Sequence, residues 1–227
     1  MVFSLLTLGG ILSSAPRREP LYRGPVHPAP SQRMLMIRVS QESSPGAGDF
    51  DRNILGFVKA LQSDGNAASF YRYYLRGVNY GNDDPQLTSN TSHVFFVNAA
   101  DGLALFFVNN TTGSTEGDGG TAATRWDLSG GTAAVLLQDD EGEVTTSHGG
   151  TVFTTFFSWA QSNTDGMVVG ALPVGCTLLG QFTAPPSGLE GGWEVISEDG
   201  AIIRVELEVG RRVRLDVALH VNVRQDP

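Results

Sequence analysis

The sequence predicts an all-β fold, an antiparallel β-sandwich or jelly roll with one short helix and an extended N-terminal arm. Three observations lead to this fold class. From His93 onward, short runs of apolar and β-branched residues recur at close spacing. The linkers between them contain Asp-Gly, Gly-Gly or Pro-Pro, which suit chain reversals. No alternating helical pattern separates the runs, so we expect residues 34–227 to form a single β-sandwich domain.

Residues 1–33 are expected to be a targeting segment or an arm. They begin with an apolar stretch of about a dozen residues, which is too short to span a bilayer. Small residues follow this stretch, as in a secretory signal, but the first charges, Arg17 and Arg18, lie behind it rather than before it. The alternative is an arm that docks on a neighbouring subunit. Pro16, Pro20 and the prolines up to residue 30 favour an extended linker in either case.

The next segment carries the expected first strand and the helix. Residues 34–41 are predicted to form a strand. Within residues 49–63, Ile54, Val58 and Leu61 recur at helical spacing, and this pattern predicts the helix. Residues 68–80 are rich in tyrosine and have β propensity. This segment is predicted to be either core or a contact surface, because tyrosine is enriched at interfaces.

The remaining chain is predicted to be strands and turns. Trp126, Trp159 and Trp193 are expected in the core between two sheets, because large aromatic residues dominate such packing. Phe153, Phe157 and Trp159 should share one strand face by their period of two. The expected strands are residues 93–98, 103–109, 121–128, 132–138, 143–147, 151–161, 167–173, 176–183, 192–197, 201–209 and 211–223.

Three Asp-Gly dipeptides precede apolar runs. Asp101-Gly102 and Asp199-Gly200 lie between two strand patterns, and they are predicted to be hairpin turns in which glycine supplies a positive φ. Asp165-Gly166, in "SNTDGMVVG", has two interpretations, a turn or part of a binding loop.

The binding interpretation involves a second acidic loop, "QDDEGEV" at residues 138–144. Calcium takes six to eight oxygen ligands from carboxylates, amides and backbone carbonyls, and loops between strands can supply them. The spacing does not match an EF-hand, so an ordinary solvated turn is the alternative. The predicted calcium ligands are Asp139, Asp140, Glu143, Asn163 and Asp165.

Residues 121–217 carry a family resemblance. "GTAAVLLQDDEGEV", "FFSWAQSNTDGMVVGALP" and "GGWEVISEDGAIIRVEL" occur in this order. The segment resembles β-sandwich segments of secreted or surface-anchored bacterial proteins, in which an acidic turn precedes two turns that each combine a tryptophan with Asp-Gly. The resemblance implies an extracellular, non-catalytic module with no assigned substrate.

Charge and cysteine content exclude several classes of function. The formal net charge is -9 and no basic block is present, so nucleic acid is not an expected partner. Cys176 is the single cysteine, which rules out an intramolecular disulfide, and its apolar surroundings predict a buried thiol rather than a nucleophile. The four histidines show no metal-binding spacing, and no hydrolase or nucleotide-binding motif is present. Asp127 beside Trp126 and Glu194 beside Trp193 are typical of sugar sites, although such pairs also arise in sandwich cores.

Two functions remain in contention, with a β-sandwich enzyme behind them. The first is a non-catalytic structural subunit of an extracellular, surface or shell-like assembly, whose partners are other copies of itself. The alternative is a calcium-dependent carbohydrate-binding module, which implies calcium as cofactor and glycan as partner. Both place the protein outside the cell or at its surface, with no membrane span.

Overall fold

The computed structural model describes residues 33–72, 80–82, 84–111, 119–190, 192–206 and 208–221. The chain divides into two compact units, Met1–Pro30 and Ser31–Pro227, and every described residue belongs to the second. The targeting segment or arm predicted for residues 1–33 lies outside the described residues, except for Arg33, which begins a strand.

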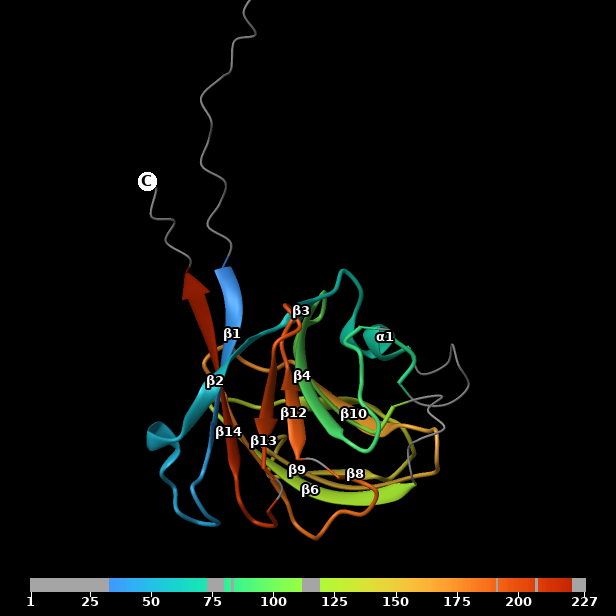
Figure 1. Ribbon diagram of the computed structural model, residues 1–227. Coiled ribbons are helices and arrows are strands. Elements are labelled where there is room, and N and C mark those ends of the chain that lie inside the picture. The colour runs from blue at the N-terminus through green and yellow to red at the C-terminus, as the bar shows by residue number, and fades with distance from the viewer. Residues whose placement is uncertain are drawn as a thin grey trace, which may run out of the picture. The chain divides into compact units, whose positions relative to one another are not determined.

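The described strands form two sheets (Figure 1). The first sheet has the order β2-β1-β14-β11-β6-β9-β8, and all of its pairings are antiparallel. Its inner strands pair on both sides, as β14 does with β1 and β11. Its members are β1 (Arg33–Gln41), β2 (Ile54–Lys59), β6 (Gly120–Ser129), β8 (Val144–Ser147), β9 (Val152–Trp159), β11 (Thr177–Phe182) and β14 (Val213–Val221).

The second sheet has the order β13-β12-β4-β5-β10-β7, and a short β3 pairs with β4. Its pairings are antiparallel except for β12 with β4 and β3 with β4, which are parallel. The predicted all-β sandwich is therefore confirmed, with two parallel pairs added to it. The members are β3 (Leu61–Gln62), β4 (Ser92–Ala99), β5 (Gly102–Asn109), β7 (Ala134–Gln138), β10 (Asp165–Gly170), β12 (Trp193–Ile196) and β13 (Ile202–Val205).

The main hydrophobic core lies between the two sheets. Trp126 of β6 and Trp193 of β12 come from opposite sheets, and their rings stack at a centroid distance of 4.9 Å. Phe153, Phe157 and Trp159 all point into this core from β9, as their spacing predicts. All three tryptophans are buried, which confirms their predicted core positions. Burial of an aromatic side chain stabilises the sandwich, because it removes a large apolar area from water.

A second core covers the outer face of the second sheet. Helix α1 (Ala67–Tyr71) lies beside β4 and β10 (Figure 1), and Tyr71 and Tyr80 pack on Phe95 and Phe106 of that face. Strands β4 and β5 are therefore buried on both faces, which explains their nearly continuous apolar sequences. The predicted tyrosine-rich strand is wrong at Tyr71, which is helical and buried, and residues 73–79 lie outside the described residues.

The helix predicted within residues 49–63 is wrong. Residues Phe50–Arg52 form a single 3₁₀ turn (η1), and strands β2 and β3 follow it. Phe57 pairs with Arg38 of β1 and is exposed, whereas the adjacent Val58 is buried, so the side chains alternate with a period of two. Pairing with β1 overrides the local helical spacing, because it both satisfies the backbone hydrogen bonds of β2 within a sheet and buries one face of the strand in the core.

The three Asp-Gly dipeptides separate into two kinds. Gly102 and Gly200 have φ values of 110° and 79° at the ends of their hairpins, which confirms the predicted turns. Asp165 and Gly166 instead begin strand β10, and the preceding turn contains Ser162 with a φ of 66°. Gly166 is needed for space rather than for φ, since an added Cβ would lie 2.4 Å from the carbonyl oxygen of Phe107.

Candidate functional site

The predicted calcium ligands lie where the chain crosses between the sheets. Residues 139–143 connect β7 of the second sheet to β8 of the first, and residues 160–164 connect β9 of the first to β10 of the second. The carboxyl groups of Asp139, Glu143 and Asp165 meet between these two crossings, and we call this group the carboxyl corner.

Asp165 links the two sheets through its side chain. Its Oδ2 accepts a hydrogen bond from the backbone N–H of Ser158 in β9, at 2.7 Å, and its carboxyl is hydrogen bonded to that of Glu143. Burial, the contact with Glu143 and the nearby negative charges raise the pKa of Asp165 from 3.8 to about 9. Asp165 is therefore a neutral acid at pH 7, with its carboxyl against that of Glu143.

The side chain of Asp139 is hydrogen bonded to a residue of helix α1. The hydroxyl of Tyr71 donates a hydrogen bond of 2.9 Å to Oδ2 of Asp139, and both groups are buried. Burial raises the pKa of Asp139 from 3.8 to about 8, and the charges of Glu143 and Asp140 add to this rise, although the Tyr71 hydrogen bond opposes it. Oδ1 of Asp139 and Oδ1 of Asp165 have no hydrogen-bond donor among the described residues.

Two predicted ligands are not part of this corner. Asp140 is exposed at its rim, where its backbone N–H donates to Oε2 of Glu143 at 3.1 Å. Asn163 uses its backbone carbonyl to accept a hydrogen bond of 2.8 Å from the side chain of Asn110. Sequence reasoning did not identify Tyr71, which is 68 residues from Asp139, or the Ser158 amide, which is a backbone group and leaves no mark in the side-chain pattern.

No group of three or more histidine, cysteine, aspartate or glutamate side chains in the described residues is arranged to hold a metal ion. Asp139 and Asp165 of the carboxyl corner are buried, hydrogen-bonded acids whose pKa values lie well above 3.8. Calcium binding there stays a prediction.

A second candidate surface lies on the first sheet, at strands β2, β1 and β14. Ile54, Leu55 and Phe57 of β2 are exposed, and Phe57 keeps 58% of its surface accessible to solvent. Beside Phe57 is a groove of about 430 Å³, lined by Met36, Ala218 and Leu219 and bordered by the ion pair of Arg38 with Asp216. We call these exposed side chains and the groove the β2 surface.

The other singled-out residues are structural. Cys176 is buried, and burial raises the pKa of its thiol to about 11, so the thiolate is scarce at neutral pH, as predicted. Trp126 and Trp193 point into the core, away from the side chains of Asp127 and Glu194, because neighbouring residues of a strand face opposite ways. The two tryptophans therefore form no sugar-binding platform with these acids.

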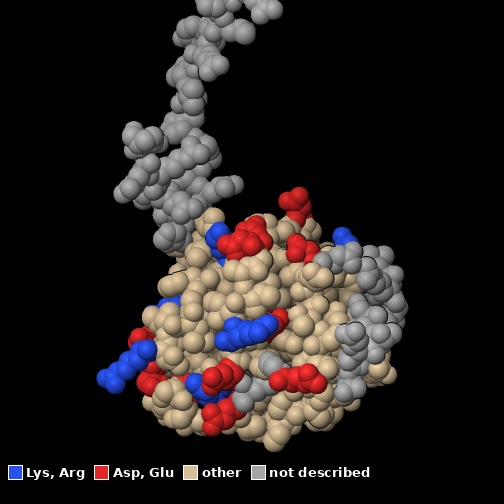
Figure 2. All heavy atoms as spheres, viewed as in Figure 1, with Lys and Arg blue, Asp and Glu red and all other residues tan. Residues whose placement is uncertain are grey.

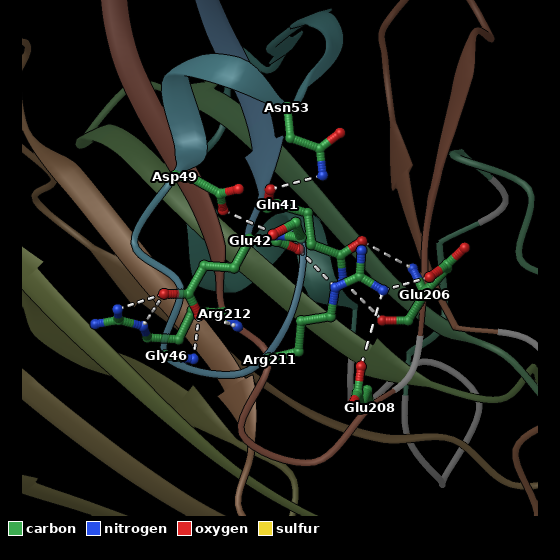
Figure 3. A network of polar contacts seen from close by, with 10 residues as sticks. Gln41, Glu42, Gly46, Asp49, Asn53, Glu206, Glu208, Arg211 and Arg212 are labelled. Atoms are coloured by element: carbon green, nitrogen blue, oxygen red, sulfur yellow. Dashed lines mark hydrogen bonds and ion pairs between the residues drawn. The ribbon is translucent and has the colours of Figure 1, made fainter.

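Arginines 211, 212 and 214 take part in ion pairs at one end of the first sheet. Figure 3 shows Arg212 against the carboxylate of Glu42, which is fully buried and follows β1. Glu42 also accepts the backbone N–H of Gly48 at 2.8 Å and that of Arg212 at 3.0 Å. Arg211 bonds to the carbonyl of Glu42 and forms an ion pair with Glu206 (Figure 3). These residues hold the loop after β1 against the start of β14.

Acidic and basic side chains are interspersed on the face that Figure 2 shows, with several blue groups directly beside red ones. No helix in the described part of the chain is long and apolar enough to cross a membrane.

Comparison of the chain with protein-family models, with curated proteins and with solved structures gave no match. The resemblance of residues 121–217 to bacterial surface proteins stays a prediction.

Proposed function

We propose that the protein is a non-catalytic structural subunit that associates with other copies of itself through the β2 surface. The observation that carries this proposal is the exposure of apolar side chains on β2 next to an apolar groove. Adjacent exposed apolar side chains mark interaction sites, because leaving them in water costs free energy that association recovers.

A second copy is the partner that this surface fits. A two-fold axis would place Phe57 of each copy near the groove of the other, and the Arg38–Asp216 pair would form a polar rim around the contact. The location outside the cell rests on the sequence alone, on the signal-like residues 1–15 and the resemblance to surface proteins.

Phe156 offers a matched control for the test. It lies on β9 in the same sheet and is 60% exposed, almost the same fraction as Phe57, but it is outside the β2 surface. Sedimentation of the wild type, Phe57→Asp and Phe156→Asp over a range of concentrations would measure association. We expect the wild type and Phe156→Asp to associate and Phe57→Asp to stay monomeric. A wild-type protein that remains monomeric at high concentration would contradict the proposal.

A second candidate function is calcium binding at the carboxyl corner, favoured by the two buried carboxyl oxygens that lack donors. Calcium would have to displace the proton of Asp165, whose pKa is raised to about 9. Melting temperatures in EDTA, calcium and magnesium test this, with Asp165→Asn as the variant and the exposed Glu141→Gln as the control. Calcium binding predicts a higher melting temperature in calcium for the wild type and Glu141→Gln, but not for Asp165→Asn.

A further inference from the structure

A polar cleft of about 740 Å³ lies where β4 and β12 begin and β13 ends, away from the residues of both sites described above. Hydroxyl-bearing residues line one wall, at positions 88, 89 and 91 before β4. Glu190, Glu194 and Glu206 contribute three acids, of which Glu206 is paired with Arg211, and Arg204 is the basic side chain among the described lining residues. The lining is therefore more acidic than basic.

Glu194 lies at the bottom of this cleft. Its side chain is only 6% exposed, although it carries a carboxylate that needs hydrogen-bond donors. Across the sheet, Glu194 pairs with His93 on β4 and with Arg204 on β13, so the three side chains form a row.

His93 does not supply a proton to Glu194. Its Nε2 accepts a hydrogen bond of 2.9 Å from the backbone N–H of Thr88, and its Nδ1 lies 3.2 Å from the carbonyl of Val108. This arrangement fixes the neutral tautomer with the proton on Nδ1, and burial lowers the pKa of His93 to about 4. Among the described residues, Oε2 of Glu194 therefore has a long contact of 3.4 Å from the Thr88 hydroxyl and lies 4.0 Å from Nε2 of the neutral His93.

Arg204 shows which group this carboxylate accepts. Its Nε and a terminal nitrogen both lie 3.2 Å from Oε1 of Glu194, so a guanidinium already occupies one oxygen. The Arg204 side chain is 83% exposed, and such an exposed partner is held weakly because solvent screens the ion pair. Glu194 lines the cleft, and its volume of about 740 Å³ leaves room for another cationic group beside the carboxylate.

We propose that the cleft around Glu194 binds a guanidinium or ammonium group, which comes either from a small organic cation or from an arginine or lysine side chain of a peptide. The ligand donates hydrogen bonds to Oε2 of Glu194, and Glu190 at the rim adds a second negative charge. The Thr88 hydroxyl turns to accept from the same group.

Titration calorimetry with argininamide and with citrulline amide tests this proposal, because the two ligands have nearly the same shape and differ in charge. A blocked tripeptide with a central arginine, and its citrulline counterpart, tell a free cation from a peptide side chain. We expect binding of the arginine compounds and at least tenfold weaker binding of the citrulline compounds. Equal affinity of the two, or no binding of either, would overturn the proposal.

Three variants locate the site. Glu194→Gln should weaken binding at least tenfold, and Glu190→Gln, which lies on the exposed rim, should weaken it about threefold without risk to folding. Arg204→Ala should tighten binding, since it removes the competing guanidinium. The exposed Glu141→Gln on another loop should bind like the wild type. Weaker binding in Arg204→Ala, or unchanged binding in both glutamine variants of the cleft, would contradict the assignment.

Discussion

Two of the places where the described chain buries carboxyl groups, the loop after β1 and the carboxyl corner, treat them in opposite ways. Glu42, after β1, faces Arg212 and two backbone amides, and although burial opposes ionisation, these hydrogen bonds lower its pKa from 4.5 to about 2. Asp139 and Asp165 at the carboxyl corner have no basic partner among the described residues, so burial raises their pKa values to about 8 and 9. The same side-chain chemistry is thus ionised at one end of the molecule and neutral at the other.

The number of hydrogen-bond donors, rather than burial alone, therefore decides whether a buried acid is charged. Glu42 is fully buried and yet ionised, because a guanidinium and amides replace the water that it lost. Asp165 is hydrogen bonded to one backbone amide and to the carboxyl of Glu143, and these two contacts do not stabilise a negative charge enough to offset burial.

The largest expected effect is the dependence of stability on pH. The folded chain keeps protons on Asp139 and Asp165 that the unfolded chain releases above about pH 4, so the free energy of unfolding falls as pH rises from there towards 8 or 9, then levels off. Each carboxyl contributes a slope of up to about 1.4 kcal/mol per pH unit. Glu42 acts in the other direction, since its contribution is lost as pH falls from 4.5 to 2. We expect maximum stability near pH 4 to 5, measured by urea unfolding across pH.

Two variants that replace an acid with its uncharged amide separate the contributions of the carboxyl corner and of Glu42 to the pH dependence of stability. Asp165→Asn retains an acceptor for the Ser158 amide and a donor for Glu143, so it should flatten the decline between pH 5 and 8. Glu42→Gln should flatten the decline below pH 4.5 and leave the other limb unchanged. A wild-type profile with its maximum above pH 7 would contradict the neutral state of the corner.

The next largest change in the free energy of unfolding is expected from removal of the Glu42 side chain. Glu42→Ala leaves the guanidinium of Arg212 and the amides of Gly46 and Gly48 without their acceptor, and we expect a loss of about 3 kcal/mol in the free energy of unfolding at pH 7. Urea unfolding followed by tryptophan fluorescence measures it. A loss below that of Arg212→Ala would show that the loop amides find other acceptors.

Gly166→Ala tests the packing of the carboxyl corner with an intermediate effect. The added Cβ would lie 2.4 Å from the carbonyl oxygen of Phe107 and 3.0 Å from the hydroxyl of Tyr71, so β10 or α1 has to move. We expect a cost of about 2 kcal/mol in unfolding free energy, typical of overpacking. Thermal melts at pH 5 check it, and an unchanged melting temperature would mean that β10 shifts freely.

The smallest effect is expected at an exposed ion pair. Arg125 and Asp127 lie two residues apart on the outer face of β6 and are bonded at 2.7 Å, with both side chains more than a third exposed. Asp127→Asn should change the unfolding free energy by less than about 0.5 kcal/mol, because water screens the pair. A loss as large as the one expected for Glu42→Ala would contradict the predicted difference between exposed and buried acids.

The strands and the tryptophan core could be predicted from the sequence, because alternation and turn residues are local signals. Strands β2 and β3 could not, since Ile54, Val58 and Leu61 have helical spacing. Ile54 and Val58 become strand residues by pairing with β1, and Leu61 by pairing with β4. The carboxyl corner was predicted in part. Asp139, Glu143 and Asp165 stand out as acids beside turn residues, whereas Tyr71 and the Ser158 amide, which donate hydrogen bonds to Asp139 and Asp165, come from other elements. Glu42 gave no local signal, because its partner is 170 residues away.

Strand β5 lies between β4 and β10 and has a hydrophobic core on each of its faces. Its amides are bonded along both edges, and no side of the strand meets water, so hydrogen exchange there requires the whole domain to unfold. The slowest-exchanging amides of the protein are therefore expected in β5. Their exchange rates would report the global free energy of unfolding without any denaturant.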